Sequence, residues 1–550
     1  MQKYRFHIHS THVSSNNKDE VNNAVVVKEK ILVRDDNNQE SWYDHLNIFV
    51  DPVRPFWITS VPYRTHRYKK EFEDIDKLEM FTCHDSELTT KVAEALGYRS
   101  YGSYKPYKSL RTLCSSPYVY GADIKTEVLI KQKYVDKQPE GVVPFLSKGA
   151  FDIENEVNGD KRINLITFIH EHQIYTAALK EYCRIYDEAT DTFTPATKED
   201  CLKVINDVIG SEITKHNFTL NFSIHESELE LITWIFDRIH ECKTDFIGVW
   251  NIHHDLPLII ERIEALGGDV AEIMAHPDVP KQYRYASYKE DISKTDHFTD
   301  KWHWMSITGY SQFLDSMCLY ARLRKVSGRE VSYKLDDIAN KELGQGKLHF
   351  GEITNHWKAQ HYEFLPYIAY NINDVLIMML MEWKNNDIGS LMGLIPVTIP
   401  SQFSRQTTAL SNDFFYTGKK TGKLPAAVGD QMYTPWDTQY PKVGGTVLPP
   451  DKAIGVGIEA LEGIKRSTQV TVATNDSDVT SMYPSTVQSF NVDKETMLIS
   501  SLGINGYSHT ASEKFFSDVL RPDLNAVDIC SVFYGLPNYT NVLNEFDKEF

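Results

Sequence analysis

The chain has 550 residues, of which 41% are hydrophobic and 12% aromatic, and its formal net charge is −18. A chain of this length does not fold around one core, so we expect two to four domains. The acidic balance argues against a protein that simply wraps nucleic acid, but it permits an enzyme with an acidic metal site beside a local basic groove.

The sequence contains no run of 18 or more apolar residues, and its N-terminus lacks the apolar core of a signal peptide. We therefore expect no membrane contact and a cytoplasmic location. The seven cysteines are scattered and include no C-x-x-C pair. This spacing favours a reducing compartment and disfavours a zinc site.

The first 145 residues are predicted to be rich in strands, with strands over 25–33 and 46–50 and a helix over 85–96. The segment 64–70 is basic, with Tyr63 and Tyr68 interleaved. Such a stretch can contact a nucleic-acid backbone, but a solvated surface is the more common explanation.

An acidic pair comes next, on a predicted strand. Residues 151–154, with strands over 162–169 and 173–179 behind them, alternate apolar and acidic side chains. The period of a strand places Asp152 and Glu154 on one face. A divalent cation offsets the repulsion between two such carboxylates, and hard oxygen ligands suit Mg²⁺ or Mn²⁺. In so acidic a chain the triplet can also arise by chance, so its meaning depends on whether later segments add further carboxylates.

A second acidic position lies just after a buried strand. A helix is predicted over 226–241 with a capping box, then a strand over 246–250 and a helix from about 258 to 266. Asp255 lies between the last two elements, where α/β proteins usually place their sites. His253 and His254 are either metal ligands or solvent-facing; the absence of further His or Cys at ligand spacing favours the latter.

The remaining part of the chain supplies a third acidic position. Residues 281–308 are predicted to form a loop or hairpin, 332–343 a helix, 363–383 a long helix and 419–425 a loop. Tyr370 and Asp374 share one face of the long helix, a spacing that in isolation is usually a surface pair.

Together these positions form a set of carboxylates from separate elements: Asp152, Glu154, Asp255 and Asp374, with Tyr370 one turn before the last. Four carboxylates can hold two Mg²⁺ ions about 4 Å apart, of which one activates a water and the other stabilises a leaving 3′ oxygen. A tyrosine beside them can orient the water. This is the arrangement that a 3′→5′ exonuclease needs.

In this order the motifs resemble the amino-terminal half of a family-B DNA polymerase of the kind found in large tailed bacteriophages. Asp152 and Glu154 match the first exonuclease motif, D-x-E. Asp255 matches the acidic residue of the second, and Tyr370 with Asp374 matches the third, Y-x-x-x-D. Asn251 opens the second motif, and the resemblance implies that it contacts DNA. Segments 116–124 and 332–348 resemble the same family.

A polymerase motif comes after the predicted strand over 469–473. Residues 478–485, D-V-T-S-M-Y-P-S, resemble D-x-x-S-L-Y-P-S. The resemblance implies that Asp478 binds the polymerising metal ions. It also implies that Ser481, Met482 and Tyr483 contact the incoming deoxynucleotide and that Tyr483 rejects a ribose 2′-OH. Gly444 and Gly445 match the end of the DNA-contacting Y-x-G-G motif.

The sequence departs from the family in three places. The second exonuclease motif is one residue shorter than N-x-x-x-F-D, with His254 where Phe is usual, and Lys442 replaces the Tyr of the linker motif. The fingers helix and the later D-x-D have no counterpart. Because one carboxylate cannot hold two metal ions, polymerisation is expected only with a C-terminal partner chain. Either a second polypeptide carries the rest, as in a split polymerase, or the chain is a truncated product, and the split polymerase is favoured.

The resemblance implies an α/β fold, α+β overall. It predicts an N-terminal β-rich domain over 1–145 that is completed by about 386–445. It also predicts an RNase H-like DEDDy exonuclease domain with a mixed sheet and flanking helices over 146–385, and a partial palm over 446–550. The cofactors would be two Mg²⁺ or Mn²⁺ ions, and a viral protein would act in the host-cell cytoplasm.

The implied substrate is DNA, a primer–template whose single-stranded 3′ end is stacked on aromatic side chains. Phe151 and the tyrosines of 281–308 are candidates for stacking, and Phe151 is equally well explained as a core residue. Two alternatives remain open: an independent 3′→5′ DNA exonuclease, and a non-catalytic nucleic-acid-binding protein derived from a polymerase.

Overall fold

The computed structural model describes residues 2–13, 23–66, 69–70, 72–98, 109–157, 159–295, 297–348 and 356–430. Contacts within the chain divide it into two compact units, Met1–Met432 and Tyr433–Phe550, and all described residues belong to the first. The predicted partial palm, the strand over 469–473 and the turn at Gly444 and Gly445 therefore lie outside the described residues.

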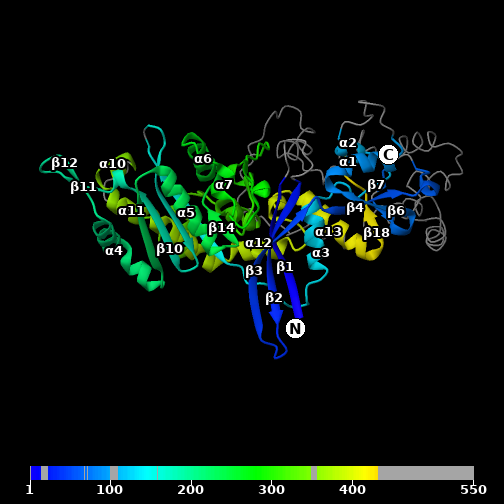
Figure 1. Cartoon of the computed structure of the whole chain (residues 1–550), viewed down its shortest axis with the longest axis horizontal. Coiled ribbons are helices and arrows are strands. Elements are labelled where there is room, and N and C mark those ends of the chain that lie inside the picture. The colour runs from blue at the N-terminus through cyan, green and yellow to red at the C-terminus, as the bar shows by residue number, and fades with distance from the viewer. Residues whose placement is uncertain are drawn as a thin grey trace, which may run out of the picture. The chain divides into compact units, whose positions relative to one another are not determined.

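The largest sheet of the described residues, called the central sheet below, is mixed and has six strands in the order β13-β10-β9-β8-β14-β17 (Figure 1). Its strands are β8 (Lys148–Asn155), β9 (Ile163–His170), β10 (Gln173–Leu179), β13 (Thr219–His225), β14 (Phe246–Val249) and β17 (Gln312–Asp315). β9 pairs antiparallel with β8 and β10, whereas β13 is parallel to β10, and β14 is parallel to both β8 and β17. All strands except β9 thus run in one direction.

Helices cover both faces of the sheet and bury its alternating side chains. One face packs against α4 (Lys198–Lys215), α8 (Ser316–Leu323) and α11 (Phe364–Asn385). The other face packs against α5 (Glu228–Cys242) and α6 (Ile252–Ala265). On β8, Ala150 faces the α11 side and Phe151 and Ile153 face the α5 side. The period of the strand therefore directs Asp152 and Glu154 toward α11.

Smaller elements complete the architecture around this sheet. They include the hairpins β11 (Arg184–Asp187) with β12 (Thr192–Pro195) and β15 (Ala286–Lys289) with β16 (Trp304–Ile307). Short helices form at α7 (Val270–Met274), α9 (Leu335–Leu343), α10 (His356–Tyr362) and α12 (Asp387–Leu394). The mixed α/β class that the sequence predicted is confirmed.

The first 135 residues are largely β-structure. β1 (Gln2–Val13), β2 (Ala24–Arg34) and β3 (Glu40–Val50) form an antiparallel sheet, and β4 (Val53–Thr59) pairs with β6 (Leu78–His84) and β7 (Val119–Tyr120). The helices among the described residues of this region are α1 (Leu88–Ala95), α2 (Leu110–Leu113) and α3 (Thr126–Val135). A distant segment joins this region, because β18 (Lys423–Pro425) pairs with β5 (Phe72–Asp74), and Phe415 of α13 (Gln406–Thr421) packs on Trp57.

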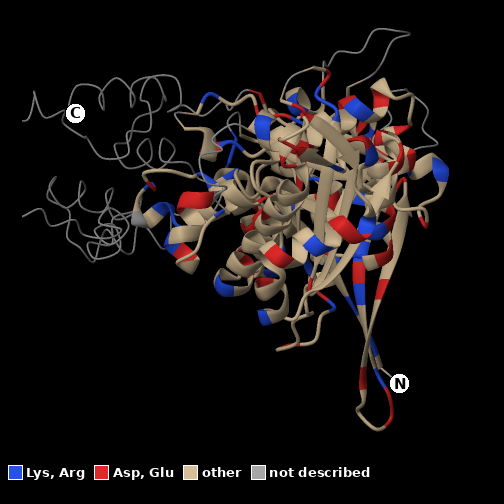
Figure 2. Ribbon diagram, turned by 90° about the vertical axis from the view of Figure 1, so that its left-hand side faces the viewer, with Lys and Arg blue, Asp and Glu red and all other residues tan. Residues whose placement is uncertain are grey.

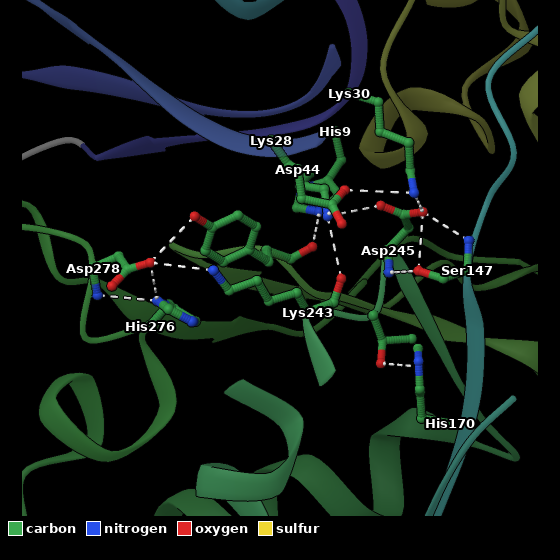
Figure 3. A network of polar contacts seen from close by, with 12 residues as sticks. His9, Lys28, Lys30, Asp44, Ser147, His170, Lys243, Asp245, His276 and Asp278 are labelled. Carbon is green, nitrogen blue, oxygen red and sulfur yellow. Dashed lines mark hydrogen bonds and ion pairs between the residues drawn. The ribbon is translucent and has the colours of Figure 1, made fainter. Parts of the chain in front are cut away.

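A buried network of charges joins β2 and β3 to the central sheet (Figure 3). Lys28 Nζ lies 2.8 Å from Asp44 and 2.9 Å from Asp245, and Lys30 Nζ lies 2.9 Å from Asp245. The Ser147 backbone N–H also donates to Asp245 at 2.7 Å. Acidic and basic residues are interspersed along the strands of the β1–β3 sheet (Figure 2). Burial of Lys28, Lys30 and Asp245 is tolerated because each of them pairs with an opposite charge.

Several predicted elements are confirmed, and two are wrong. The strands over 25–33, 151–154 and 173–179, the capped helix α5 and the hairpin within 281–308 form as predicted. Residues 419–425 are not a loop, because α13 continues to Thr421 and β18 comes after it. Helix α6 begins at Ile252 rather than near 258, because Asn251 turns the chain with a left-handed φ of 72°. Asp255 therefore lies in the first turn of a helix.

Helix α11, with 22 residues, is the longest helix in the part of the chain that the structure describes. It is long and apolar enough to cross a membrane, but 89% of its most apolar 18-residue window is buried inside the protein. Such burial is typical of the core helix of a soluble protein. Its hydrophobic sides pack on β8, β9 and α4, which fixes one face of the helix over the carboxylates of β8.

Candidate metal centre

Three carboxylates predicted from the sequence converge between β8 and α11. The ligand oxygens of Asp152, Glu154 and Asp374 all lie within 4.8 Å of one another. Asp374 is buried, and the other two are partly buried. Three acidic groups this close are unfavourable without a compensating positive charge.

The helical period explains why α11 faces β8 with polar side chains. Tyr367, Asn371 and Asp374 are spaced four and three residues apart, so they share one face of the helix. The Tyr367 hydroxyl donates a hydrogen bond to Glu154, and Asn371 Nδ2 donates to Asp152 at 2.7 Å. These two bonds hold the carboxylates of β8 in place.

Lys347 is the cation of this cluster. Its ammonium group lies 2.5 Å from Asp374 Oδ2 and donates to the Tyr370 hydroxyl at 2.9 Å. The second oxygen, Asp374 Oδ1, is buried and has no hydrogen-bond partner among the described residues. An unsatisfied buried carboxylate oxygen costs free energy, and a bound cation would remove that cost.

Burial and mutual repulsion raise the pKa values of the three carboxylates. Burial, followed by the charges of Asp255, Glu154 and Asp374, raises the pKa of Asp152 well above its usual value. Burial raises the pKa of Glu154 to about 7 although the Tyr367 hydrogen bond opposes it. Burial likewise raises the pKa of Asp374 to about 6 against the effect of Lys347. The single lysine does not compensate the cluster.

Asp255, the fourth predicted ligand, lies next to this group without belonging to it. Its side chain is only 4% exposed, burial raises its pKa, and its charge is the strongest of those acting on Asp152. His254 Nδ1 lies 3.6 Å from Asp255 Oδ1, and the His254 side chain is 62% exposed. The structure thus brings all four predicted carboxylates into one region.

A buried aspartate at the end of β17 positions the Asp255 helix. Asp315 accepts hydrogen bonds from the backbone N–H of Cys318 at 2.8 Å and of Ile252 at 3.1 Å. It therefore caps α8 and anchors the first residue of α6. Burial raises the pKa of Asp315 to about 6.

Other predicted site residues have different placements. Phe151 is fully buried and contacts Phe313 edge-on, so its core alternative is supported and its assignment to DNA stacking is corrected. Asn251 supplies the turn before α6. His253 contacts the Tyr288 hydroxyl at 2.7 Å rather than the carboxylates. Asp478, Ser481, Met482 and Tyr483 lie outside the described residues.

The basic stretch at 64–70 is tied to the protein in its described positions. Arg64 donates to the Thr59 carbonyl at 2.7 Å, Lys69 is buried against the Cys114 carbonyl, and Lys70 pairs with Glu73 at 2.8 Å. These contacts favour neither the nucleic-acid explanation nor a simple solvated surface.

Sequence reasoning assigned no role to Lys347, Tyr367 or Asn371. The last two could have been found from the helical period, because they precede Asp374 on the same face. Lys347 carries no comparable signal, since it comes from the segment after α9 and meets α11 only in the folded chain.

The chain matches no protein-family model, and the search of curated proteins finds no significant similarity to it. The function must therefore be argued from the site itself.

Proposed function

We propose that the chain is a two-metal 3′→5′ DNA exonuclease that forms the amino-terminal part of a family-B replicative DNA polymerase. The exonuclease assignment rests on the convergence of Asp152, Glu154 and Asp374 within 4.8 Å, with Asp255 beside them. The order β10-β9-β8-β14-β17, with β9 alone reversed, supports an RNase H-like DEDDy domain.

The donor set fits Mg²⁺ or Mn²⁺. All ligands are carboxylate oxygens, which hard divalent cations prefer, and Asp374 Oδ1 is buried without a partner among the described residues. Asp152, Glu154 and Asp374 would hold one ion, and Asp255 would extend the set toward a second. Such ions activate a water for attack on phosphorus and stabilise the leaving 3′ oxygen.

The protein side chains supply the remaining steps. Tyr367 and Asn371 fix the two carboxylates of β8, so the ligands are oriented before substrate arrives. The Tyr370 hydroxyl, held by Lys347, orients the attacking water beside Asp374. The Lys347 ammonium offsets negative charge as a phosphodiester approaches, since burial would lower its pKa but Asp374 and Tyr370 raise it.

The polymerase part of the proposal rests on the family resemblance of residues 478–485. Deoxynucleotides would bind there, and a C-terminal partner chain would supply the missing metal ligands. The independent exonuclease is distinguished from this proposal only by whether such a partner restores synthesis.

The test uses the purified chain with a 5′-labelled primer–template that has a mismatched 3′ end, Mg²⁺ and four deoxynucleotides. We expect shortening without extension. Asp152→Ala and Asp374→Ala should each reduce cleavage at least about a thousandfold, or roughly 4 kcal/mol in activation free energy. Tyr370→Phe should reduce it about tenfold, since one hydroxyl that orients the water is lost.

The matched control is Asp237→Ala, which removes an exposed aspartate from α5 and should cleave like the wild type. Wild-type cleavage by Asp152→Ala would contradict the exonuclease assignment. Extension of the primer by the chain alone would contradict the need for a partner.

A further inference from the structure

An aromatic cluster next to the carboxylates has no role in the proposed chemistry. It is formed by the β11–β12 hairpin and α10, which lie together in Figure 1. The rings of Trp357 and His361 stack 5.1 Å apart at 9°, and Phe193 contacts both His361 and Tyr362. Tyr186 contacts Phe193 and Tyr362. Two elements distant in sequence thus build one aromatic surface.

A pocket of about 290 Å³ opens beside this surface, lined in part by Glu156, Tyr182, Arg184, Trp357, Gln360 and His361. Its volume is at the lower end of small-ligand pockets, roughly 300–1,000 Å³. The pocket therefore suits a single nucleobase or nucleoside rather than a larger ligand. The Trp357 side chain remains 36% exposed, so its ring is accessible.

The pocket is adjacent to the carboxylate cluster, because its lining starts just after Glu154 in the chain. Gln360 Nε2 donates to the carbonyl of Asn155, the residue after Glu154, at 2.8 Å. The Gln360 side chain also hydrogen-bonds the Tyr367 hydroxyl, which in turn donates to Glu154. Glu156 is two residues beyond Glu154, a span of at most about 7 Å. A base in the pocket therefore belongs to a nucleotide close to the scissile bond.

Arg184 gives this pocket a positive charge. The Arg184 guanidinium lies 4.1 Å from the Phe193 ring centre and 3.0 Å from His361 Nδ1. Its Nε is buried and has no hydrogen-bond partner among the residues that the structure describes. No acidic residue in the described part of the chain forms an ion pair with it. Burial, then Arg184, lowers the pKa of His361, so this histidine accepts from Arg184 as a neutral ring.

The acidic residues of the pocket already have partners. Glu156 accepts a hydrogen bond from the Tyr182 hydroxyl, and Glu181 pairs with Arg162 at 2.7 Å. Arg184 is therefore a positively charged side chain that the pocket offers to an incoming anion, and Glu156 keeps its own negative charge beside it. An accessible tryptophan beside an uncompensated arginine is the combination that binds single-stranded nucleic acid, by stacking and phosphate contact.

We propose that this pocket binds a nucleobase from one of the three nucleotides at the 3′ end of the substrate strand, stacked on Trp357, while Arg184 holds its phosphate. The proposal rests on the proposed exonuclease function and adds a substrate subsite to it. The subsite holds the strand so that its 3′ end reaches the carboxylates.

The first test measures binding without catalysis. A fluorescein-labelled ten-nucleotide oligodeoxythymidylate is titrated with the full chain in EDTA, and its anisotropy is recorded. Trp357→Ala should weaken binding roughly five- to hundredfold, and Trp357→Phe should restore most of it, because one stacked base is lost or kept. Arg184→Gln should weaken binding and flatten its salt dependence.

Two control variants match these changes elsewhere in the unit. Trp42→Ala removes a tryptophan of similar exposure, 38%, from β3. Arg238→Gln removes an arginine that also lies over an aromatic ring, that of Trp234 at 5.5 Å, but pairs with Glu241. Both should bind like the wild type. Equal losses in the controls and the pocket variants would overturn the proposal.

A second test locates the base. An abasic residue is placed in turn at each of the three 3′ positions of the oligonucleotide. The wild type should bind the oligonucleotide more weakly when one particular position is abasic. Trp357→Ala should bind that abasic oligonucleotide as well as it binds the intact one. If the abasic residue and Trp357→Ala weaken binding by independent factors at every position, the subsite is wrong.

A variant that fails to fold, as judged by circular dichroism, is replaced by a change in the DNA. An uncharged methylphosphonate beside the located base should weaken binding to the wild type more than a methylphosphonate near the 5′ end of the same oligonucleotide. Equal losses at the two positions would overturn the phosphate contact.

The two proposals fail in different ways. If the wild type does not cleave DNA but its binding depends on Trp357 and the located base, the exonuclease function is wrong and the binding pocket stands. If the wild type cleaves DNA and Trp357→Ala binds and cleaves equally well, the pocket is wrong and the exonuclease stands.

Discussion

Two groups of acidic side chains lie near opposite ends of the parallel strands β8 and β14, and positive charges compensate them in different ways. Asp245, just before β14, is fully buried and lies 2.9 Å from both Lys28 and Lys30, which also contact Asp44. Among the described residues, the cluster of Asp152, Glu154 and Asp374 forms an ion pair with Lys347 alone.

The acidities reflect this difference. Burial alone would raise the pKa of Asp44, but Lys28 and Lys30 outweigh it and hold that pKa below its usual value. Burial and repulsion instead raise the pKa values of Asp152, Glu154 and Asp374. A balanced network stabilises the fold by itself, whereas the cluster gains stability only from protons or a cation. Equivalent substitutions in the two groups should therefore have opposite consequences.

The largest effect is expected from the isosteric pair Asp245→Asn and Asp152→Asn. Asp245→Asn leaves two buried lysines short of a counter-charge and should lower the free energy of unfolding by about 3–5 kcal/mol. Asp152→Asn removes one repelling carboxylate and should leave the metal-free protein within about 1 kcal/mol of wild type, or more stable. Urea unfolding of both variants in EDTA checks this. Comparable losses in both would remove the distinction between the groups.

Local sequence patterns predict the carboxylate cluster around Asp152 but not the charge network around Asp245. Asp152, Glu154, Asp255 and Asp374 were found because a strand of period two, a strand end and a helical face each place a carboxylate. Lys28 and Asp245 are more than two hundred residues apart, and each looks like an ordinary surface charge in its own segment. Their pairing arises only from the docking of β2 on the start of β14.

The start of α6 shows a second limit of sequence reasoning. The sequence predicts that this helix starts near residue 258. The helix begins at Ile252 instead, because Asn251 adopts a left-handed turn and Asp315 accepts from the Ile252 backbone N–H. That bond comes from β17, 63 residues away, and no local pattern reports it.

A divalent cation should supply the compensation that the cluster lacks. At Mn²⁺ concentrations about 100 times Kd, the free energy of unfolding of the wild type should rise by roughly 2.7 kcal/mol over its value in EDTA. Asp152→Asn and Asp374→Asn should lose most of this increment, because each removes a ligand charge. Asp245→Asn should keep it despite its lower stability, since its substitution lies in the compensated network. If Mn²⁺ stabilises Asp152→Asn as much as it stabilises the wild type, the ion binds at another site.

The smallest expected effect is the pH dependence of that increment. The pKa values of Glu154 and Asp374, about 7 and 6, exceed their ordinary values of 4.5 and 3.8. Between pH 4 and 7 the folded protein therefore binds more protons than the unfolded chain. Stability in EDTA should consequently fall as the pH rises through this window.

Mn²⁺ must displace those same protons, and each displaced proton contributes about 1.4 kcal/mol per pH unit. The Mn²⁺ increment should accordingly be larger at pH 8 than at pH 6, by roughly 1–2 kcal/mol. Thermal or urea unfolding at both pH values, with Mn²⁺ and with EDTA, measures the difference, and Asp374→Asn is the control with little increment at either pH. An increment that is equal at the two pH values would mean that the carboxylates are already ionised at pH 6. Lys347 would then compensate the cluster better than its 2.5 Å contact with Asp374 alone suggests, and the contrast with the Asp245 network would narrow.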